Sequence, residues 1–81
     1  MNSPTEDTDF DDLTPMDVGE TCRFFGGHSS PLNPSTLYRG VKAGKYPGPV
    51  KIGDGTSRWL RGECKRALRR MIAERDAKVA A

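Results

Sequence analysis

Glycine and proline residues divide this 81-residue chain into short segments, and the length of these segments limits what the chain can fold into. Gly26-Gly27 closes one segment, Asn33-Pro34 opens the next, and Gly44 closes that one. Further on, Gly53-Asp54-Gly55 separates two short runs in which apolar and polar residues alternate. Because glycine and proline interrupt helices, while Asn-Pro and Asp-Gly favour caps and turns, each segment should hold one element. At this length we expect one domain with a small core.

The first segment predicts a helix over residues 15–25. Thr14 is expected to cap it, Pro15 takes the first helical position, and acidic residues follow in the first turn. Apolar residues recur at i, i+4 and i+7, on one helical face: Val18, Cys22 and Phe25. The Gly/Ser/Pro-rich stretch at 26–33 is then a turn, and it is longer than the turn usual in a helix-turn-helix.

The remaining segments predict a second helix, a hairpin and a third helix. Asn33 caps a helix over 34–43, which has Leu37 and Val41 on its inner face, and Gly44 ends it. The Asp-Gly pair predicts a β-hairpin over about 49–59. From Leu60 onwards the helical period returns, which predicts a helix over 61–77 with this apolar face: Leu60, Cys64, Ala67/Leu68 and Met71/Ile72.

Charge is distributed very unevenly along the chain. Residues 1–20 hold seven acidic residues and no Lys or Arg, a net charge of −7, whereas residues 21–81 hold thirteen basic and four acidic residues, a net charge of +9. Such asymmetry favours an acidic tail joined to a domain that binds a polyanion, against the alternative of a merely solvated basic surface. We expect residues 1–14 to be a disordered tail, because they hold too little apolar surface to offset the entropy of ordering. The folded domain should span 15–78, and residues 79–81 should fray.

The residues that enzymes and metal sites need are scarce. His28 is the only histidine, and the four acidic residues of the basic part form no pair on one helical face, so we expect no enzyme activity and no cofactor. A zinc site from Cys22, His28 and Cys64 would have three ligands and no close cysteine pair, so we expect no metal. The two cysteines are expected to be reduced and buried as small apolar groups. No apolar run is long enough to span a membrane and no signal peptide is evident, so we expect a cytoplasmic, nucleoid-associated protein.

The second predicted helix is the best candidate for contacts with DNA bases. In a helix-turn-helix the second helix lies in the major groove. The outward side chains of this helix are Ser35, Thr36, Tyr38, Arg39 and Lys42. Arg39 is the leading candidate for base readout, because a guanidinium can pair with O6 and N7 of guanine. For Tyr38 a structural role remains open, in which the ring packs on Trp59 or Phe25.

The hairpin and the third helix supply further candidates. A narrow basic hairpin can enter the minor groove or follow the phosphates. Residues 45–49 (KYPGP) form an extended connector before the hairpin. The candidates on the connector and the hairpin are Lys45, Lys51, Thr56, Ser57 and Arg58. Lys51 has the alternative of a solvated strand face, whereas the Arg58 guanidinium is expected over the Trp59 indole. In the third helix Arg61 and Lys65 are candidate phosphate contacts, and its basic cluster alternatively meets a neighbouring protomer or water.

Four pieces of the sequence, taken in order, resemble a known family. They are Pro34–Arg39 (PSTLYR), Gly44–Pro47 (GKYP), Pro49–Gly53 (PVKIG) and Ser57–Trp59 (SRW). In this order they are similar to the AlpA-like and excisionase group of small winged helix-turn-helix proteins, which are related to the MerR-type fold. The resemblance covers about half of the chain. The turn at 26–33 is longer than in that family, and Glu63–Leu68 differs from the usual family ending.

The resemblance implies a mainly α fold with a small β-hairpin, a winged helix-turn-helix. It also implies an excisionase, a recombination directionality factor of a mobile genetic element, whose copies bind attachment-site DNA side by side and steer an integrase towards excision. Tyr38 and Arg39 then fall on the recognition helix and Arg58 on the wing. Two alternatives stay open: an AlpA-type transcription regulator, and a protein-interaction module resembling an antirepressor. The expected partners are double-stranded DNA, neighbouring copies of the chain and a site-specific integrase, with no membrane.

Overall fold

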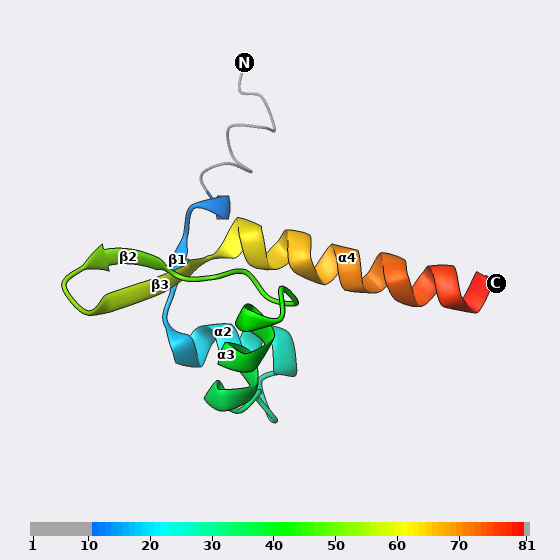
Figure 1. The fold of residues 1–81 in the computed structure, drawn as a ribbon, viewed down its shortest axis with the longest axis horizontal. Helices are drawn as coiled ribbons and strands as arrows, with labels where there is room; N and C mark the ends of the chain where they lie inside the picture. The colour runs from blue at the N-terminus through cyan, green and yellow to red at the C-terminus, as the bar shows by residue number, and fades with distance from the viewer. Residues whose placement is uncertain (1–10, 81) are drawn as a thin grey trace, which may run out of the picture.

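The fold combines three helices with a three-stranded antiparallel sheet in the part of the chain that the computed structural model describes, residues 11–80. The elements in order are β1 (Pro15–Met16), α2 (Val18–Gly26), α3 (Pro34–Lys42), β2 (Val50–Gly53), β3 (Thr56–Leu60) and α4 (Arg61–Ala80). The fold is mostly helical, as predicted (Figure 1). Residues 1–10, most of the expected tail, and Ala81 lie outside the described residues.

The first helix begins three residues later than the sequence predicts. Asp17, and not Thr14, is its N-cap: the Asp17 Oδ1 accepts from the Glu20 backbone N–H at 2.7 Å, and the Glu20 Oε1 accepts from the Asp17 N–H at 3.0 Å. This reciprocal capping box fixes the start of α2 at Val18. Pro15 is therefore in β1 and not in the helix, so its expected role as the first helical residue is wrong.

The second helix follows its local signals closely. The Asn33 side chain accepts from the Ser35 backbone N–H at 2.8 Å, and Pro34 occupies the first turn, where its missing N–H costs nothing. Gly44 has a φ of 81° just after the helix, the conformation expected of the glycine that ends it. Between α2 and α3 the turn folds back on α2, where the Leu32 N–H donates to the Cys22 carbonyl at 3.1 Å.

The predicted hairpin belongs to a larger sheet of strand order β1-β3-β2. In β2 and β3, Val50 pairs with Arg58 and Gly53 pairs with Thr56, with an irregularity between Lys51 and Gly53. Only Gly55 of the turn has a positive φ, 72°, so the Asp-Gly turn is not of type I′, which needs two positive values. The short β1 pairs Met16 with Trp59 on the other side of β3, a contact that no alternation in the sequence predicts.

Trp59 is the centre of the core. Its indole is completely buried, and its Nε1–H donates to the Pro47 carbonyl at 2.9 Å, which satisfies the one polar atom of the ring. The buried apolar cluster around it draws on every helix and on both β1 and the connector: Met16, Cys22, Leu37, Tyr46 and Cys64. β3 thus ties the two short helices to α4.

The last helix is anchored only through its first half. Cys64 and Ala67 are buried and Met71 is half-buried, but Ile72 is 42% exposed, so the expectation that it belongs to the inner face is wrong. From Ile72 to Val79 every residue is exposed, and the helix runs to Ala80, beyond the predicted end at 77. Figure 1 shows this half (orange to red) reaching away from the other elements.

Candidate nucleic-acid interface

Helix α3 separates its apolar and polar residues as the sequence predicts. Leu37 is fully buried and Val41 half-buried against the core. Of the five predicted outward residues, Thr36 is half-buried and the others are exposed: Ser35, Tyr38, Arg39 and Lys42. The outer face therefore offers a hydroxyl group, a phenol and two cations.

The Arg39 side chain lies along the helix, and its positive charge has no carboxylate partner in residues 11–80. Its Nη2 donates to the Thr36 Oγ1 at 3.3 Å, one turn back. No carboxylate of residues 11–80 pairs with Arg39, because the ion pairs of this part of the chain involve only Arg61, Lys65, Arg66 and Arg75. A guanidinium with free donors can bind an acceptor pair such as O6 and N7 of guanine.

The structure shows one of the two roles considered for Tyr38, the packing of its ring on Trp59. Its ring meets the Trp59 indole edge to face, with 5.8 Å between centroids and 61° between planes, while 48% of the residue stays exposed. Phe25, the other packing partner considered, instead stacks on Tyr46, at 4.6 Å between centroids. The Tyr38–Trp59 contact fixes α3 relative to β3.

Tyr46 sets the distance between α3 and the connector that follows it. The ring is buried and lies over Gly40, where a Cβ would fall 2.3 Å from the Tyr46 Cδ2. Next to it the Lys45 Nζ lies 5.6 Å from the centre of the same ring. This cation–π contact keeps the Lys45 ammonium beside the C-terminal end of α3, where Lys42 is also exposed.

The hairpin carries its candidates in two different environments. Lys51 is exposed on β2, between the exposed Val50 and Ile52, whereas Thr56, Ser57 and Arg58 on β3 are half-buried. The predicted contact of Arg58 with the Trp59 indole is wrong: consecutive strand residues point to opposite faces, and the Arg58 Nη1 donates to the Ser57 carbonyl at 2.9 Å. Arg58 therefore lies on the face opposite the core.

The two candidate phosphate contacts of α4 already have acidic partners. The Lys65 ammonium bonds to the Asp11 carboxylate and lies 3.5 Å from Asp12, and the Arg61 Nε lies 3.9 Å from Asp11. The hydrogen bond from Lys65 lowers the pKa of Asp11, and the same contact raises the pKa of Lys65. Arg61 and Lys65 thus differ from the cations of α3 and the hairpin, which have no carboxylate partner in residues 11–80.

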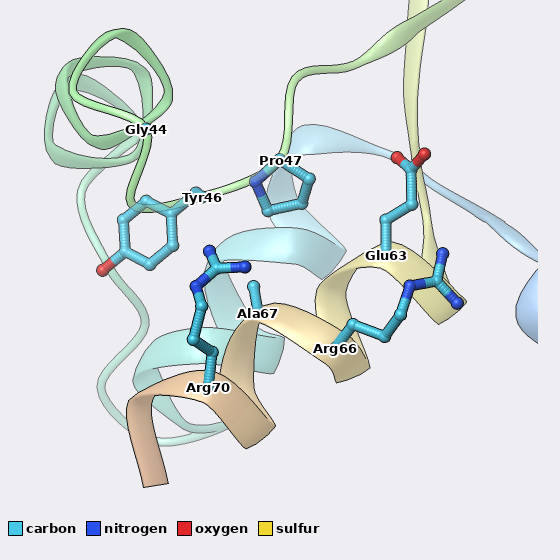
Figure 2. Close-up of a pocket in the computed structure, with 7 residues that line it drawn as sticks. All are labelled: Gly44, Tyr46, Pro47, Glu63, Arg66, Ala67 and Arg70. Atoms are coloured by element: carbon cyan, nitrogen blue, oxygen red, sulfur yellow. The ribbon is translucent and has the colours of Figure 1, made fainter. Parts of the chain in front are cut away.

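Arg66 and Arg70 belong to the basic cluster of α4, for which the sequence left open contact with DNA, with a neighbouring protomer or with water. They line a hollow of about 380 Å³ between α4 and the connector, together with Gly44, Tyr46 and Pro47. Figure 2 shows Arg70 reaching from α4 towards Tyr46, and Arg66 directed towards Glu63. In the sequence, their spacing of four residues already predicts that both lie on the same side of the helix, one turn apart.

The two cysteines, the histidine and the helices of residues 11–80 bear on thiol, metal and membrane chemistry. Cys22 and Cys64 are buried free thiols, as predicted, and burial raises the pKa of Cys64 to about 11. His28 is exposed in the turn, and no three metal-binding side chains gather in this part of the chain. None of the described helices combines the length and the apolar character that crossing a membrane requires.

Comparison with models of protein families, with curated proteins and with solved structures finds no match for this chain.

Proposed function

We propose that this chain is a sequence-specific DNA-binding protein of the winged helix-turn-helix type, in which α3 is the recognition helix and the β2–β3 hairpin is the wing. The observation that carries the proposal is the outer face of α3. Arg39 and Lys42 are exposed there without a carboxylate partner in residues 11–80, and Tyr38 couples the helix to the hairpin through Trp59.

The size of α3 supports insertion into the major groove. A helix with its side chains is about 10–12 Å across, so the groove, about 12 Å wide, admits one, and the nine residues of α3 are about 13 Å long. Its N-terminal end presents Ser35 and Thr36, and Arg39 follows one turn later. In this proposal Arg39 reads a guanine, Ser35 and Thr36 donate to a base or a phosphate, and Lys42 and Lys45 bind the backbone.

The hairpin supports a second contact with the duplex. Lys51 and Arg58 are on strands whose turn, Asp54-Gly55, is exposed, and Thr56 and Ser57 add hydroxyl donors. A narrow ribbon of this kind fits the minor groove or the phosphates beside it. Because Trp59 of β3 is buried in the core and contacts Tyr38, the base of the hairpin is in contact with α3.

Within this type, an excisionase is the role we favour. One short helix and one hairpin bury little surface, so a single copy should bind weakly and gain specificity from copies on adjacent sites. An excisionase acts in this way on attachment-site DNA and directs an integrase towards excision. A transcription regulator would use the same contacts at a promoter, and a protein-interaction module would show no affinity for duplex DNA at moderate salt.

Footprinting on attachment-region DNA of a mobile element, with a promoter fragment as comparison, tests the function. We expect protected repeats at regular spacing on the attachment DNA, filled cooperatively. Protection of the promoter fragment alone would favour the regulator, and no protection of either fragment would contradict DNA binding.

Two arginine variants and a matched control test the assigned contacts. Arg39→Ala should cost about 1–3 kcal/mol on the cognate site and little on random DNA. Arg58→Ala should weaken binding to all sequences alike and reduce the salt slope by about 1. Arg75→Ala, which removes an exposed arginine of α4 paired with Asp76, should change neither. If Arg39→Ala kept the full sequence preference, Arg39 would not be the reading residue.

A further inference from the structure

The first two turns of α4 bind a pair of carboxylates from the N-terminal side of the chain. Asp11 contacts Lys65 and Arg61, and Asp12 contacts Lys65 at 3.5 Å and Arg66 at 3.9 Å. The Arg61 N–H also donates to the Thr14 carbonyl at 3.0 Å, and β1 follows immediately, paired with β3. Three cations at the start of α4 therefore face two acidic side chains that the backbone holds in place.

Gly62 is what lets this acidic pair approach the helix. A Cβ at position 62 would fall 2.5 Å from the Asp12 Cβ, 2.7 Å from its Cγ and 3.0 Å from its Cα. Glycine has a lower helix propensity than alanine, so at the second position of α4 it brings no advantage for the helix alone. The close contact with Asp12 explains why a glycine occupies this position. It also indicates that Asp11 and Asp12 pack on α4 as part of the fold.

We propose, on the basis of the DNA-binding function proposed above, that the Asp11–Asp12 pair is an internal substitute for DNA phosphates and competes with the duplex for Arg61, Lys65 and Arg66. Carboxylate and phosphate oxygens accept the same charge-assisted hydrogen bonds from lysine and arginine. The positive end of the helix dipole at Arg61 attracts either anion. In the free protein the acidic pair neutralises this cluster, and in the complex the phosphates replace it.

The acidic pair is held weakly enough for DNA phosphates to replace it on α4. Asp11 is 49% exposed and Arg66 is 62% exposed, so water and salt screen their charges. Among these groups only Lys65 and Asp11 share a hydrogen bond, while Asp12 Oδ1 and Arg61 Nε are buried atoms that make none in residues 11–80. A polyanion that satisfies all three cations offers a better arrangement for them.

Competition has a defined effect on recognition. While the acidic pair is bound, the cluster contributes little attraction for any DNA, because the pair must first be displaced. This cost is the same on random and on cognate duplex, so neutralising the pair should raise affinity for both by a similar factor and leave the choice of site to α3.

Two variants remove the competitor by different means. Asp11→Asn with Asp12→Asn removes its charge, and Gly62→Ala expels it by a clash while leaving every charge in place. At low salt we expect both to bind random duplex about tenfold more tightly than wild type, with a salt slope steeper by about 1–2. The matched control, Glu74→Gln with Asp76→Asn, adds the same net charge on the exposed half of α4 and should gain less than about threefold.

Titration of the Asp11 carboxyl by NMR gives a readout that needs no recognition of a sequence. Its pKa should be below the ordinary value in free wild type, and it should return to that value in Gly62→Ala and when saturating random duplex is added. An Asp11 pKa that stayed low on DNA, or Asp variants that bound like the control, would overturn competition while leaving DNA binding intact. If no variant bound any duplex, the proposed function itself would fail and competition with it, and the titration without DNA would still report the docking.

Discussion

The edge of the Tyr38 ring rests on the Trp59 indole, which the chain holds fully buried. This contact joins the outer face of α3 to the strand that also carries the hairpin. The two surfaces proposed to meet DNA are therefore connected through one aromatic pair, and not merely adjacent along the chain.

Truncating Tyr38 should show how much that pair contributes. We expect Tyr38→Ala to lower the free energy of unfolding by about 1 kcal/mol, since the aromatic contact and part of the ring burial are lost. Tyr38→Phe keeps the ring and should leave stability unchanged, as the Tyr38 hydroxyl makes no hydrogen bond within residues 11–80. Urea unfolding followed by Trp59 fluorescence measures both, and equal stabilities for Ala and Phe would contradict the contact.

Gly40 should tolerate no side chain. Alanine normally stabilises a helix relative to glycine, but a Cβ here would collide with the Tyr46 ring at 2.3 Å. We expect Gly40→Ala to destabilise the protein by about 1–3 kcal/mol through this overpacking. Gly19→Ala is the matched control in α2, where the nearest atom lies at 3.5 Å, and it should be neutral or stabilise by about 0.5 kcal/mol in thermal unfolding.

The start of α2 can be located by removing each candidate cap. Asp17→Ala should cost about 1 kcal/mol in the free energy of unfolding, because it removes the Oδ1 that accepts from the Glu20 backbone N–H, although the Asp17 backbone N–H can still donate to Glu20. Thr14→Ala should cost clearly less, since the structural contact of Thr14 is made by its backbone carbonyl. Chemical denaturation of the two variants measures both losses of stability. A larger loss in Thr14→Ala than in Asp17→Ala would place the N-cap at Thr14, as the sequence alone predicts.

Cys64 should make stability fall at high pH. Its pKa is raised from 9.0 to about 11 because burial disfavours the thiolate, so the unfolded chain loses its proton before the folded one. The stabilisation is fully present below pH 9.0 and is lost as pH rises through about 11. Unfolding measured across this range should show the decline in wild type and a smaller one in Cys64→Ala. Neither buried thiol should react with a disulfide reagent at neutral pH without unfolding.

Local chemistry made some of this structure predictable. The Asn33 cap, the end of α3 at Gly44 and the turn at Asp54-Gly55 each depend on a residue and its immediate neighbours, and each appears where the sequence indicated. The inner and outer faces of α3 followed from the helical period alone. These are the features for which backbone geometry decides and distant residues add little.

What escaped prediction depends on contacts between distant parts of the chain. Pro15 and Met16 have no alternating pattern, and they become a strand because β3 offers them hydrogen bonds. Lys65 is 54 residues from Asp11, so nothing near Lys65 in the sequence reveals its partner. The expected contact of Arg58 with the Trp59 indole failed for a local reason, because neighbouring residues of a strand point to opposite faces.

The exposed outer half of α4 is a helix held at one end. Its helicity is propagated from the turns fixed by Cys64 and Ala67, since a free peptide of that length would be mostly unfolded in water. Amide exchange should therefore quicken steadily towards Ala80, with the slowest amides near Ala67. A fluorophore attached at the far end would stand about 20 Å from the last buried turn, far enough to report on rotation of the whole molecule without disturbing the aromatic core.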